Sequence, residues 1–532
     1  MDVLLLIVVT FVGYLVAYHT YGRYLARRVF RIDPDRPVPA HALADGVDYV
    51  PTRKGIVFGH HFTSIAGTGP IVGPAIAVIW GWLPALLWVL VGSIVMGAVH
   101  DFGSLVVSLR HEGKSISEIV ARYVNPRARM VCFLVVFLVV TIVIAVFAMF
   151  IGVLFANFPA SVFPIWIQIP IAVALGHLVY KRGGNVALLT GVAVALMYIT
   201  IWAGQFLPFK LGEVAGIPPT GVWTLILLAY AFVASTLPVT TLLQPRDYLN
   251  AWQLVLVMGL LLVGAVTAAA TGALHMVAPA VAQAPADAPP LWPFLFVTVA
   301  CGAISGFHSL VASGTSSKQV ASERDALFVG YGSMLLEGAL AALVIVAVAG
   351  GIGMLSPDGG ASGFDAWKLR YMSWKGAGDG ALGAAVLGGA NLMGALGIPV
   401  ALGTVVMGVF IVSFAGTTLD TATRIQRYAV SEIAAGLRIH GPVQPLGGHG
   451  RGGGHRRAAG VLRRTQRPRG HEAMADVRRG EPTPGGAGPS GGDALCAAAC
   501  LRMEISGDSA AVPVYAGDDR HGDAADRAGL PP

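Results

Sequence analysis

Charged residues are scarce in this sequence, and their scarcity excludes a chain built only from ordinary soluble domains. Only 12% of the 532 residues are charged, whereas 55% are hydrophobic, and the mean hydropathy is +0.68. Soluble domains carry about 25% charged residues. The composition therefore predicts a polytopic helical membrane protein, in contact with the lipid bilayer.

Catalytic and metal-binding motifs are also missing. The chain has no Gly-x-Ser-x-Gly, His-Glu-x-x-His, P-loop or dinucleotide-binding fingerprint in a suitable context, so we predict no enzyme, no cofactor and no metal. Cys132 and Cys301 lie in apolar runs, where small core residues are expected, and Cys496 and Cys500 lie far towards the C-terminal end. The net charge of +7 does not indicate a nucleic-acid partner, because basic residues gather in short loops between apolar runs.

Apolar runs recur at the length that crosses a bilayer, about 20 residues. We predict eleven spans, at about 3–19, 55–80, 83–109, 130–157, 163–180, 185–207, 222–243, 252–275, 292–313, 327–351 and 400–418, with a short re-entrant or interfacial stretch at 381–399. Basic residues follow spans one, three, five, seven and nine, which predicts cytoplasmic loops there and an N-terminus outside. Because no basic residue precedes the first run, we expect it to remain a span rather than a cleaved signal.

The second span contains residues that do not suit a plain membrane helix. Glycine and proline free backbone groups that lipid cannot satisfy, so such backbone occurs only where protein or a cavity surrounds it. Polar residues beside a helix break indicate a binding site. The predicted substrate-binding residues here are Gly59, His60, His61, Thr63, Ser64 and Gly67. Adjacent helical residues point in different directions, so one histidine is expected to line the path and the other to pack.

Asp101 lies about two turns inside the Arg110 end of span three. It shares one small, polar helix face with Gly97, Ser104 and Ser108. Its carboxylate is either a coupling-ion or proton-relay group, or half of a structural ion pair with a basic residue such as Arg246. His100 is its neighbour in sequence but is expected to point elsewhere.

Span seven contains a second proline, Pro238, in a hydroxyl-rich stretch that includes Ser235 and Thr236. It comes five spans after the first broken span and runs the opposite way, and paired broken helices indicate an inverted repeat. We therefore predict an all-α fold with five-helix inverted repeats, formed by spans two to six and seven to eleven. The two breaks are expected to face each other at mid-membrane, with Ser235 and Thr236 in the substrate site. Helix N-termini there would suit a carboxylate.

The hydroxyls at the end of span nine have two interpretations. Small residues permit close helix packing, and oxygen ligands can hold a cation. We expect span nine beside span two, with a coupling proton or sodium ion near Ser305, His308, Ser309 and Ser313. Asp420, in the last span's extension, is either a further coupling group or the partner of Arg424, four residues on.

The sequence changes character at about residue 441. From there to 532 it has no Phe, Trp or Lys, and Gly, Pro, Ala and Arg dominate. Two interpretations compete: a natural disordered cytoplasmic tail, or the product of a frameshift in a GC-rich gene. We favour the frameshift, because the membrane domain before it looks unfinished. The predicted division is a membrane domain at 1–440 and an unfolded segment at 441–532.

Several long and unusual strings carry a family resemblance. They are GHHFTSIAG at 59–67, HDFG at 100–103, QPRDY at 244–248, SGFHS at 305–309 and DTATR at 420–424. With them the chain resembles the carbon starvation protein A family of peptide and pyruvate transporters, over most of its length to about residue 437. Further apolar spans of family members are missing beyond that point.

The resemblance implies a carbon-starvation-responsive, multi-pass inner-membrane system that takes up small peptides or pyruvate with protons. It also implies kinship with the inverted-repeat amino-acid transporters. The alternative from another class is a channel or a starvation-signalling membrane protein without active transport. The choices between peptide and pyruvate, and between proton and sodium, stay open.

Overall fold

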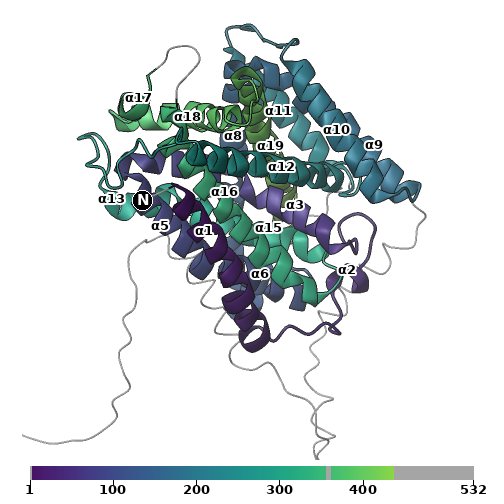
Figure 1. Ribbon diagram of the computed structural model, residues 1–532. Helices are drawn as coiled ribbons and strands as arrows, with labels where there is room; N and C mark the ends of the chain where they lie inside the picture. The colour runs from purple at the N-terminus through teal and green to yellow at the C-terminus, as the bar shows by residue number, and fades with distance from the viewer. Residues whose placement is uncertain (1–2, 355–360, 437–532) are drawn as a thin grey trace, which may run out of the picture.

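The computed structural model describes residues 3–354 and 361–436, and the predicted tail at 441–532 lies outside this part of the chain. Helices make up about 78% of the described structure, and apart from two isolated β-bridges it contains no strand. The helices form one bundle, with α15 (Gly306–Gly314) and α16 (Gly332–Ala349) in its middle and α9 (Val162–Gly176) and α10 (Val186–Gly204) at one edge (Figure 1). The predicted all-α fold is therefore confirmed, whereas the inverted repeat stays a prediction.

Nine helices among the described residues are long and apolar enough to cross a membrane, or ten if a bent pair forms one span. They are Val3–Val29, Trp82–Arg110, Arg127–Asn157, Pro159–Lys181, Val186–Gly204, Pro219–Thr236, Leu243–Ala270, Glu323–Gly353 and Val400–Ile433, with Lys54–Ala66 and Gly69–Trp80 as the bent pair. Ten of the eleven predicted spans are thus recovered. The chain is a multi-pass membrane protein.

Local signals in the sequence explain where several helices begin. Ser115 caps α7 (Ile116–Tyr123) by accepting a hydrogen bond from the Glu118 amide at 3.4 Å, and Asn125 caps α8 (Pro126–Asn157) from the Arg127 amide at 2.8 Å. Short polar side chains at these positions satisfy amides that have no partner inside the helix. The turn between the two helices therefore ends one element and starts a long span.

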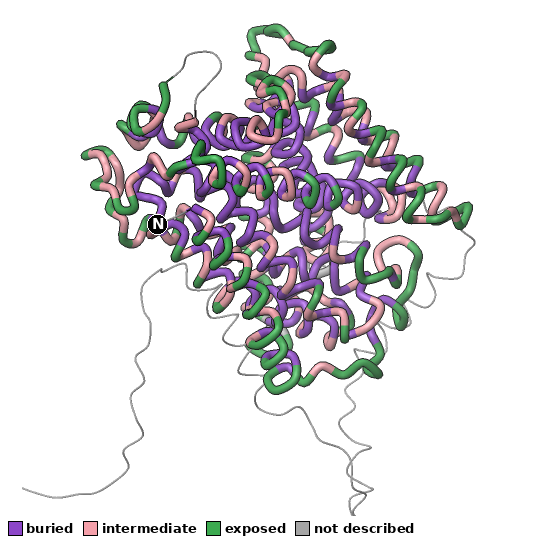
Figure 2. Tube along the Cα trace, viewed as in Figure 1, coloured by how far each residue is buried: buried purple, intermediate pink, exposed green. Residues whose placement is uncertain are grey.

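Burial separates central spans from peripheral ones (Figure 2). The span that contains α16 is 94% buried inside the protein, whereas the span that contains α8 is only 11% buried. Exposed side chains on α8, such as Leu134 and Leu138, are apolar, as lipid contact requires. Ionisable residues on α16 and its neighbours are therefore enclosed by protein.

The predicted break in span two is present. Helix α3 (Lys54–Ala66) ends at Gly67 and α4 (Gly69–Ala77) starts after it, with a bend of 42° between the two segments. Gly67 adopts a positive φ of 37°, which a residue with a Cβ rarely tolerates. Pro70 lies in the first turn of α4, where its missing N–H is not needed. Sequence and backbone thus agree on where this span breaks.

The predicted ninth span is also broken, which the sequence analysis did not foresee. It consists of α13 (Leu291–Thr298), α14 (Ala300–Ala303) and α15, with extended backbone at Ile304 and Ser305 between the last two. Helix α14 packs on α4 and α15 packs on α3, so the two broken segments lie side by side. The prediction that span nine lies beside span two is confirmed.

Two other predictions about helices have different outcomes. The stretch at 381–399 belongs mostly to α18 (Trp374–Gly394), a 21-residue helix packed against α4, α16 and α19 (Val400–Gly436). It is not among the described helices that are long and apolar enough to cross a membrane, so a re-entrant or interfacial role stays a prediction. Span seven is not interrupted by Pro238, because α11 (Pro219–Thr236) ends before it. The residue before a proline disfavours helical backbone, and Leu237 is extended here.

Candidate functional site

His60 on α3 forms a buried pair with Asp247 on α12 (Leu243–Ala270). Its Nδ1 atom lies 2.5 Å from Asp247 Oδ2, and both side chains are shielded from solvent. Gly59 permits this close approach, because a Cβ there would lie 3.1 Å from the Ala251 Cβ. In the described part of the chain, His60 Nε2 and Asp247 Oδ1 have no hydrogen-bond partner. The pair therefore retains one free atom on each side for a proton or a ligand.

His61 points away from this pair, as predicted for adjacent residues on a helix. Its Nδ1 lies 2.8 Å from the hydroxyl of Ser316, which follows α15, and its Nε2 has no hydrogen-bond partner among the described residues. Both histidines are buried. Helix α3 therefore connects two polar regions, one on each side of it.

Hydroxyls of α19 compensate for the helix break at Gly67. Thr417 donates to the Thr63 carbonyl at 3.0 Å, and Thr418 donates to the Ser64 carbonyl at 3.2 Å. These carbonyls lie in the last turn of α3, where the helix no longer supplies an amide. The Ser64 hydroxyl also contacts the hydroxyl of Thr421 at 3.0 Å. Some polar groups of the predicted substrate-binding residues Thr63 and Ser64 are thus bonded to α19, where they stabilise the helix break.

A second buried cluster joins α6 (Ala98–Arg110), α15 and α16. His308 Nδ1 lies 2.9 Å from Asp101 Oδ2, and His308 Nε2 lies 3.4 Å from Glu337 Oε2. His100 Nδ1 lies 3.1 Å from the other Asp101 oxygen. The expectation that His100 points elsewhere is therefore wrong, and so is the suggested pair between Asp101 and Arg246.

Arg246 instead forms an ion pair with Asp420 on α19, and the Tyr230 hydroxyl bridges the two residues. The predicted pair between Asp420 and Arg424 is wrong, because Arg424 pairs with Asp48 in the loop before α3. Asp420 and Arg424 lie one helical turn apart on α19. Their partners come from two different elements, because Arg246 lies on α12 and Asp48 lies in the loop before α3. Asp420 thus faces a permanent cation rather than an open path.

Ser235 and Thr236 do not lie opposite the break in span two. Their hydroxyls donate to carbonyls of their own helix, Ser235 to Phe232 at 2.8 Å and Thr236 to Val233 at 2.7 Å. Just beyond them, the Val239 amide donates to the Val47 carbonyl at 3.2 Å, in the loop between spans one and two. This end of α11 therefore contacts a loop, and the predicted facing of spans two and seven is wrong.

The hydroxyls of span nine are mostly bonded within their own helix. Ser309 donates to the Gly306 carbonyl and Ser313 to the Ser309 carbonyl, both at 2.8 Å. Ser305 precedes α15 in extended backbone. Of the predicted coupling residues, the structure brings together Asp101 and His308, whereas Asp420 lies in the separate pair with Arg246.

Three residues in the clusters were missed by the sequence analysis: Asp247, Cys301 and Glu337. Glu337 had a usable signal, because it is an isolated carboxylate in an apolar run and such residues are costly in a membrane. Asp247 belongs to a string that was noticed only for its family resemblance. Cys301 resembles any small core residue, and only the fold shows its Sγ at 3.9 Å from His308 Nε2.

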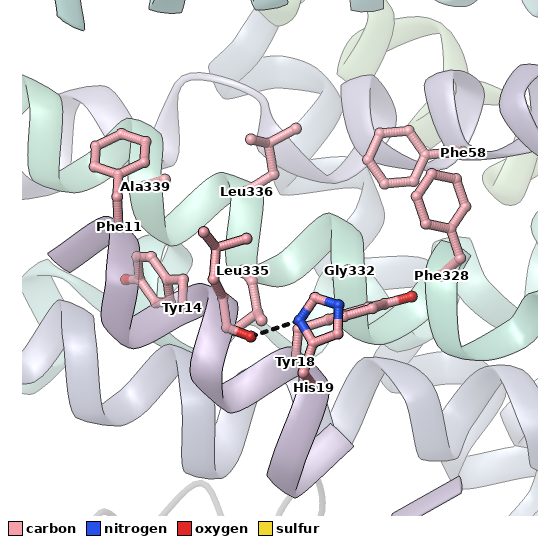
Figure 3. Close-up of a pocket in the computed structure, with 11 residues that line it drawn as sticks. Phe11, Tyr14, Tyr18, His19, Phe58, Phe328, Gly332, Leu335, Leu336 and Ala339 are labelled. Atoms are coloured by element: carbon pink, nitrogen blue, oxygen red, sulfur yellow. Dashed lines mark hydrogen bonds between the residues drawn. The ribbon is translucent and has the colours of Figure 1, made fainter. Parts of the chain in front are cut away.

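A separate apolar cavity of about 350 Å³ lies between α1 (Val3–Ala17) and α16 (Figure 3). Aromatic and aliphatic side chains line it, with Phe58 and Phe328 stacked at one end, their ring centroids 4.4 Å apart. His19 is the polar exception, and its Nδ1 bonds to the Leu15 carbonyl at 2.8 Å. The cavity lacks the converging polar groups of a site for a small charged substrate.

Broken helices around buried histidine–carboxylate pairs define a multi-pass membrane protein with an intramembrane ionisable site. Residues 2–354 match the family described as carbon starvation protein CstA, and the chain belongs to this family. The matched residues include both histidine clusters but not Asp420.

Named relatives are bacterial. The peptide transporter CstA of Escherichia coli strain K12 is 39% identical over 344 residues, which are 63% of this chain and 48% of that protein. The pyruvate/proton symporter BtsT of the same strain is 38% identical over 347 residues, 63% of this chain and 47% of that protein. The peptide transporter CstA of Bacillus subtilis strain 168 is 38% identical over 343 residues, 62% of this chain and 56% of that protein. This chain spans about half the length of these relatives, and its apolar helices place it in the bacterial inner membrane as a multi-pass protein.

Proposed function

We propose that this protein takes up small peptides or pyruvate by proton-coupled transport when preferred carbon is short. The names of its relatives supply both substrate classes and the proton. They are names of transporters, so we assign no enzymatic activity. The observation that carries the proposal is the buried His60–Asp247 pair, which has free His60 Nε2 and Asp247 Oδ1 atoms within the described structure.

The pair is suited to carry a proton. Ring nitrogens and carboxylate oxygens both bind protons, and chains of buried histidines and carboxylates act as proton relays in membrane pumps and transporters. Proton uptake would change the net charge of the buried pair by one unit, and in a protein interior such a change biases which conformation is stable. Helices α3 and α12, which carry the two residues, would then respond directly to protonation.

The substrate carboxylate, which peptides and pyruvate share, is proposed to bind near the break between α3 and α4. In the N-terminal turn of α4, Pro70 has no N–H, and the Ile71 and Val72 amides donate to the Thr68 carbonyl. The positive end of the helix dipole is therefore the feature proposed to attract the carboxylate. Gly59, His60, His61, Thr63, Ser64 and Gly67 remain the proposed binding residues. Asp101, Ser305, His308, Ser309 and Ser313 remain alternatives for coupling, and transport by their variants distinguishes them from His60.

The test is uptake of labelled pyruvate and of a labelled dipeptide into proteoliposomes, with proton and sodium gradients imposed separately. We expect His60→Gln and Asp247→Asn to lose concentrative uptake driven by the proton gradient, while substrate exchange at equal pH persists. His19→Gln is the matched control, because His19 lines the separate apolar cavity and its Nδ1 atom bonds to the Leu15 carbonyl. Surface expression of all variants is measured alongside uptake.

Proton-driven accumulation with an unchanged pH profile in both variants would contradict the role of the pair. If accumulation follows the sodium gradient alone, the coupling ion is sodium rather than the proton. Flux that never exceeds equilibrium and does not saturate would favour the alternative, a channel without active transport.

A further inference from the structure

Three potential metal ligands converge beside α15. Cys301 on α14, His308 on α15 and Glu337 on α16 each offer one ligand atom, and these atoms lie within 4.8 Å of one another. His308 Nε2 lies 3.9 Å from Cys301 Sγ and 3.4 Å from Glu337 Oε2. The extended residues Ile304 and Ser305 turn the chain between α14 and α15, which places the thiol and the imidazole on the same side.

A second carboxylate orients the histidine. Asp101 Oδ2 accepts from His308 Nδ1 at 2.9 Å, and His100 lies against the other Asp101 oxygen. Metal-binding histidines usually donate their second ring N–H to such a carboxylate, which fixes the tautomer and leaves the other nitrogen free to coordinate. His308 therefore presents Nε2 to the thiol and to Glu337.

Glu337 is a buried carboxylate that is only partly compensated. It is fully buried, its Oε2 atom lies 3.4 Å from His308 Nε2, and neither of its oxygens reaches hydrogen-bond geometry with a residue that the structure describes. Burying a carboxylate with incomplete pairing is unfavourable. A divalent cation bound between Glu337, His308 and Cys301 would lower this cost.

The ligand separations are close to those around a tetrahedral ion. Zinc bonds of about 2.0 Å to nitrogen or oxygen and about 2.3 Å to sulfur give ligand separations of roughly 3.3 to 3.6 Å. The two separations from His308 Nε2, 3.4 Å to Glu337 and 3.9 Å to Cys301, are close to these values, and all three ligand atoms lie within 4.8 Å of one another. A thiolate with an imidazole favours Zn²⁺ or a similar transition metal over Mg²⁺ and Ca²⁺, which prefer oxygen ligands.

We propose that Cys301, His308 and Glu337 bind one divalent transition-metal ion, with Zn²⁺ the best match, and that Asp101 positions His308 for it. The ion would join the broken α14–α15 segment to the central helix α16. This site does not depend on the proposed transport, and its test measures metal rather than uptake. If His308 binds a metal, the His60–Asp247 pair is the site that remains for coupling transport to protons.

The test uses purified full-length protein with Cys496→Ser and Cys500→Ser, which removes the thiols of the C-terminal segment. After chelator treatment, Co²⁺ replaces the native ion as a spectroscopic probe, and bound metal is counted by mass spectrometry. We expect one ion per chain and a thiolate-to-cobalt charge-transfer band in the near ultraviolet. Cys301→Ser should lose this band, whereas the matched control Cys132→Ser, whose thiol contacts Ser117, should keep it.

The positioning role of Asp101 has a separate readout. Asp101→Asn should keep the charge-transfer band, because the three ligands remain, but should weaken Co²⁺ binding about 10- to 100-fold. A purely structural Asp101 would leave the binding constant unchanged in a folded variant. Unchanged affinity would therefore remove Asp101 from the proposal.

A second test uses protein that retains the native Cys301, so its result does not depend on whether the Cys301→Ser variant folds. Saturating Zn²⁺ should slow alkylation of Cys301, measured by peptide mapping, and should leave Cys132 alkylation unchanged. A charge-transfer band that persists in Cys301→Ser, or equal alkylation of Cys301 with and without Zn²⁺, would overturn the metal site.

Discussion

Two regions of buried charged residues differ in whether their charge can change. The arginine region consists of the pairs Arg246–Asp420 and Arg424–Asp48, which anchor α19 to α12 and to the loop before α3. The histidine region consists of His60–Asp247 and of Asp101, His308 and Glu337. Arginine remains charged at any pH that proteins tolerate, whereas an imidazole ring exists in a neutral and a charged form.

This difference suits the arginine region to a structural role and the histidine region to a role in which its charge changes. Arg246 faces one carboxylate at ion-pair distance, and the Tyr230 hydroxyl fills part of the remaining hydrogen-bonding capacity at 2.8 Å. The histidine region has two carboxylates around His308 and a thiol nearby, and each of these groups can hold or release a proton. Stability is therefore expected to depend most on the arginine region, and function on the histidine region.

The largest effect on stability is expected from Arg246→Met. Removing one partner of a buried ion pair leaves Asp420 uncompensated and costs about 3–5 kcal/mol. The double variant Arg246→Met with Asp420→Leu should recover most of this loss, because no charge stays buried alone. The thermal stability of the parent, the single variant and the double variant is measured in detergent, as the fraction of protein that stays in the monodisperse size-exclusion peak after heating. A single variant as stable as the parent would remove the distinction between the two regions.

The second prediction concerns Asp48 in the arginine region. Burial alone would raise the pKa of its carboxyl, but the Arg424 guanidinium and hydrogen bonds from Tyr428 and Arg424 hold the pKa below its usual value of 3.8. The pair therefore stabilises the folded state fully above pH 3.8, and this contribution is lost as the pH falls through the lowered pKa.

Asp48→Asn should accordingly destabilise the protein by about 1.5–3 kcal/mol at neutral pH, the range for hydrogen bonds to charged groups. The difference in melting temperature between the two proteins should shrink below pH 4, where the parent loses the same charge. Asp45→Asn is the matched control, since among the described residues Asp45 accepts hydrogen bonds from nearby backbone amides of its own loop and forms no ion pair. A constant difference down to pH 3 would show that Asp48 does not act through its charge.

The sequence predicts features that lie within one helix, and it misses features that depend on contacts between two helices. Glycines and prolines within a few residues locate the break at Gly67, and the polar residues around it are found with it, because both signals are local. Two pairings could not be found this way, Asp101 with His308 and Asp420 with Arg246, since in each pair the two residues lie on helices that are distant in the sequence. His308 and Arg246 were named in the sequence analysis and Glu337 was not, but only packing decides which residues meet.

Pro238 shows the opposite error. Its surroundings resemble those of the first break, but here the helix ends and a loop follows, because Val239 finds a backbone partner in Val47. Proline indicates that a helix cannot continue unchanged, and it does not say whether another helix follows in line. The second break lies instead at Ile304 and Ser305, where no proline marks it.

The smallest predicted effect tests how tightly the histidine region is packed. Gly69 lets α4 approach α14 so closely that an added Cβ would lie 2.3 Å from the Cys301 Cβ and 2.4 Å from its Sγ. Gly69→Ala should therefore displace Cys301 and cost about 1–3 kcal/mol, the range for overpacking a core.

Gly259→Ala is the control for this variant, because Gly259 lies within α12 and nothing lies within 4 Å of an added Cβ. Alanine there should stabilise the helix by about 0.5–1 kcal/mol, since it loses less backbone freedom on folding. In Gly69→Ala, the rate of Cys301 alkylation should also change, whereas in Gly259→Ala it should match the parent. Equal stability and equal alkylation in the two variants would mean that α14 moves freely over α4, and the contact that holds the thiol beside His308 would then be too loose to define a site.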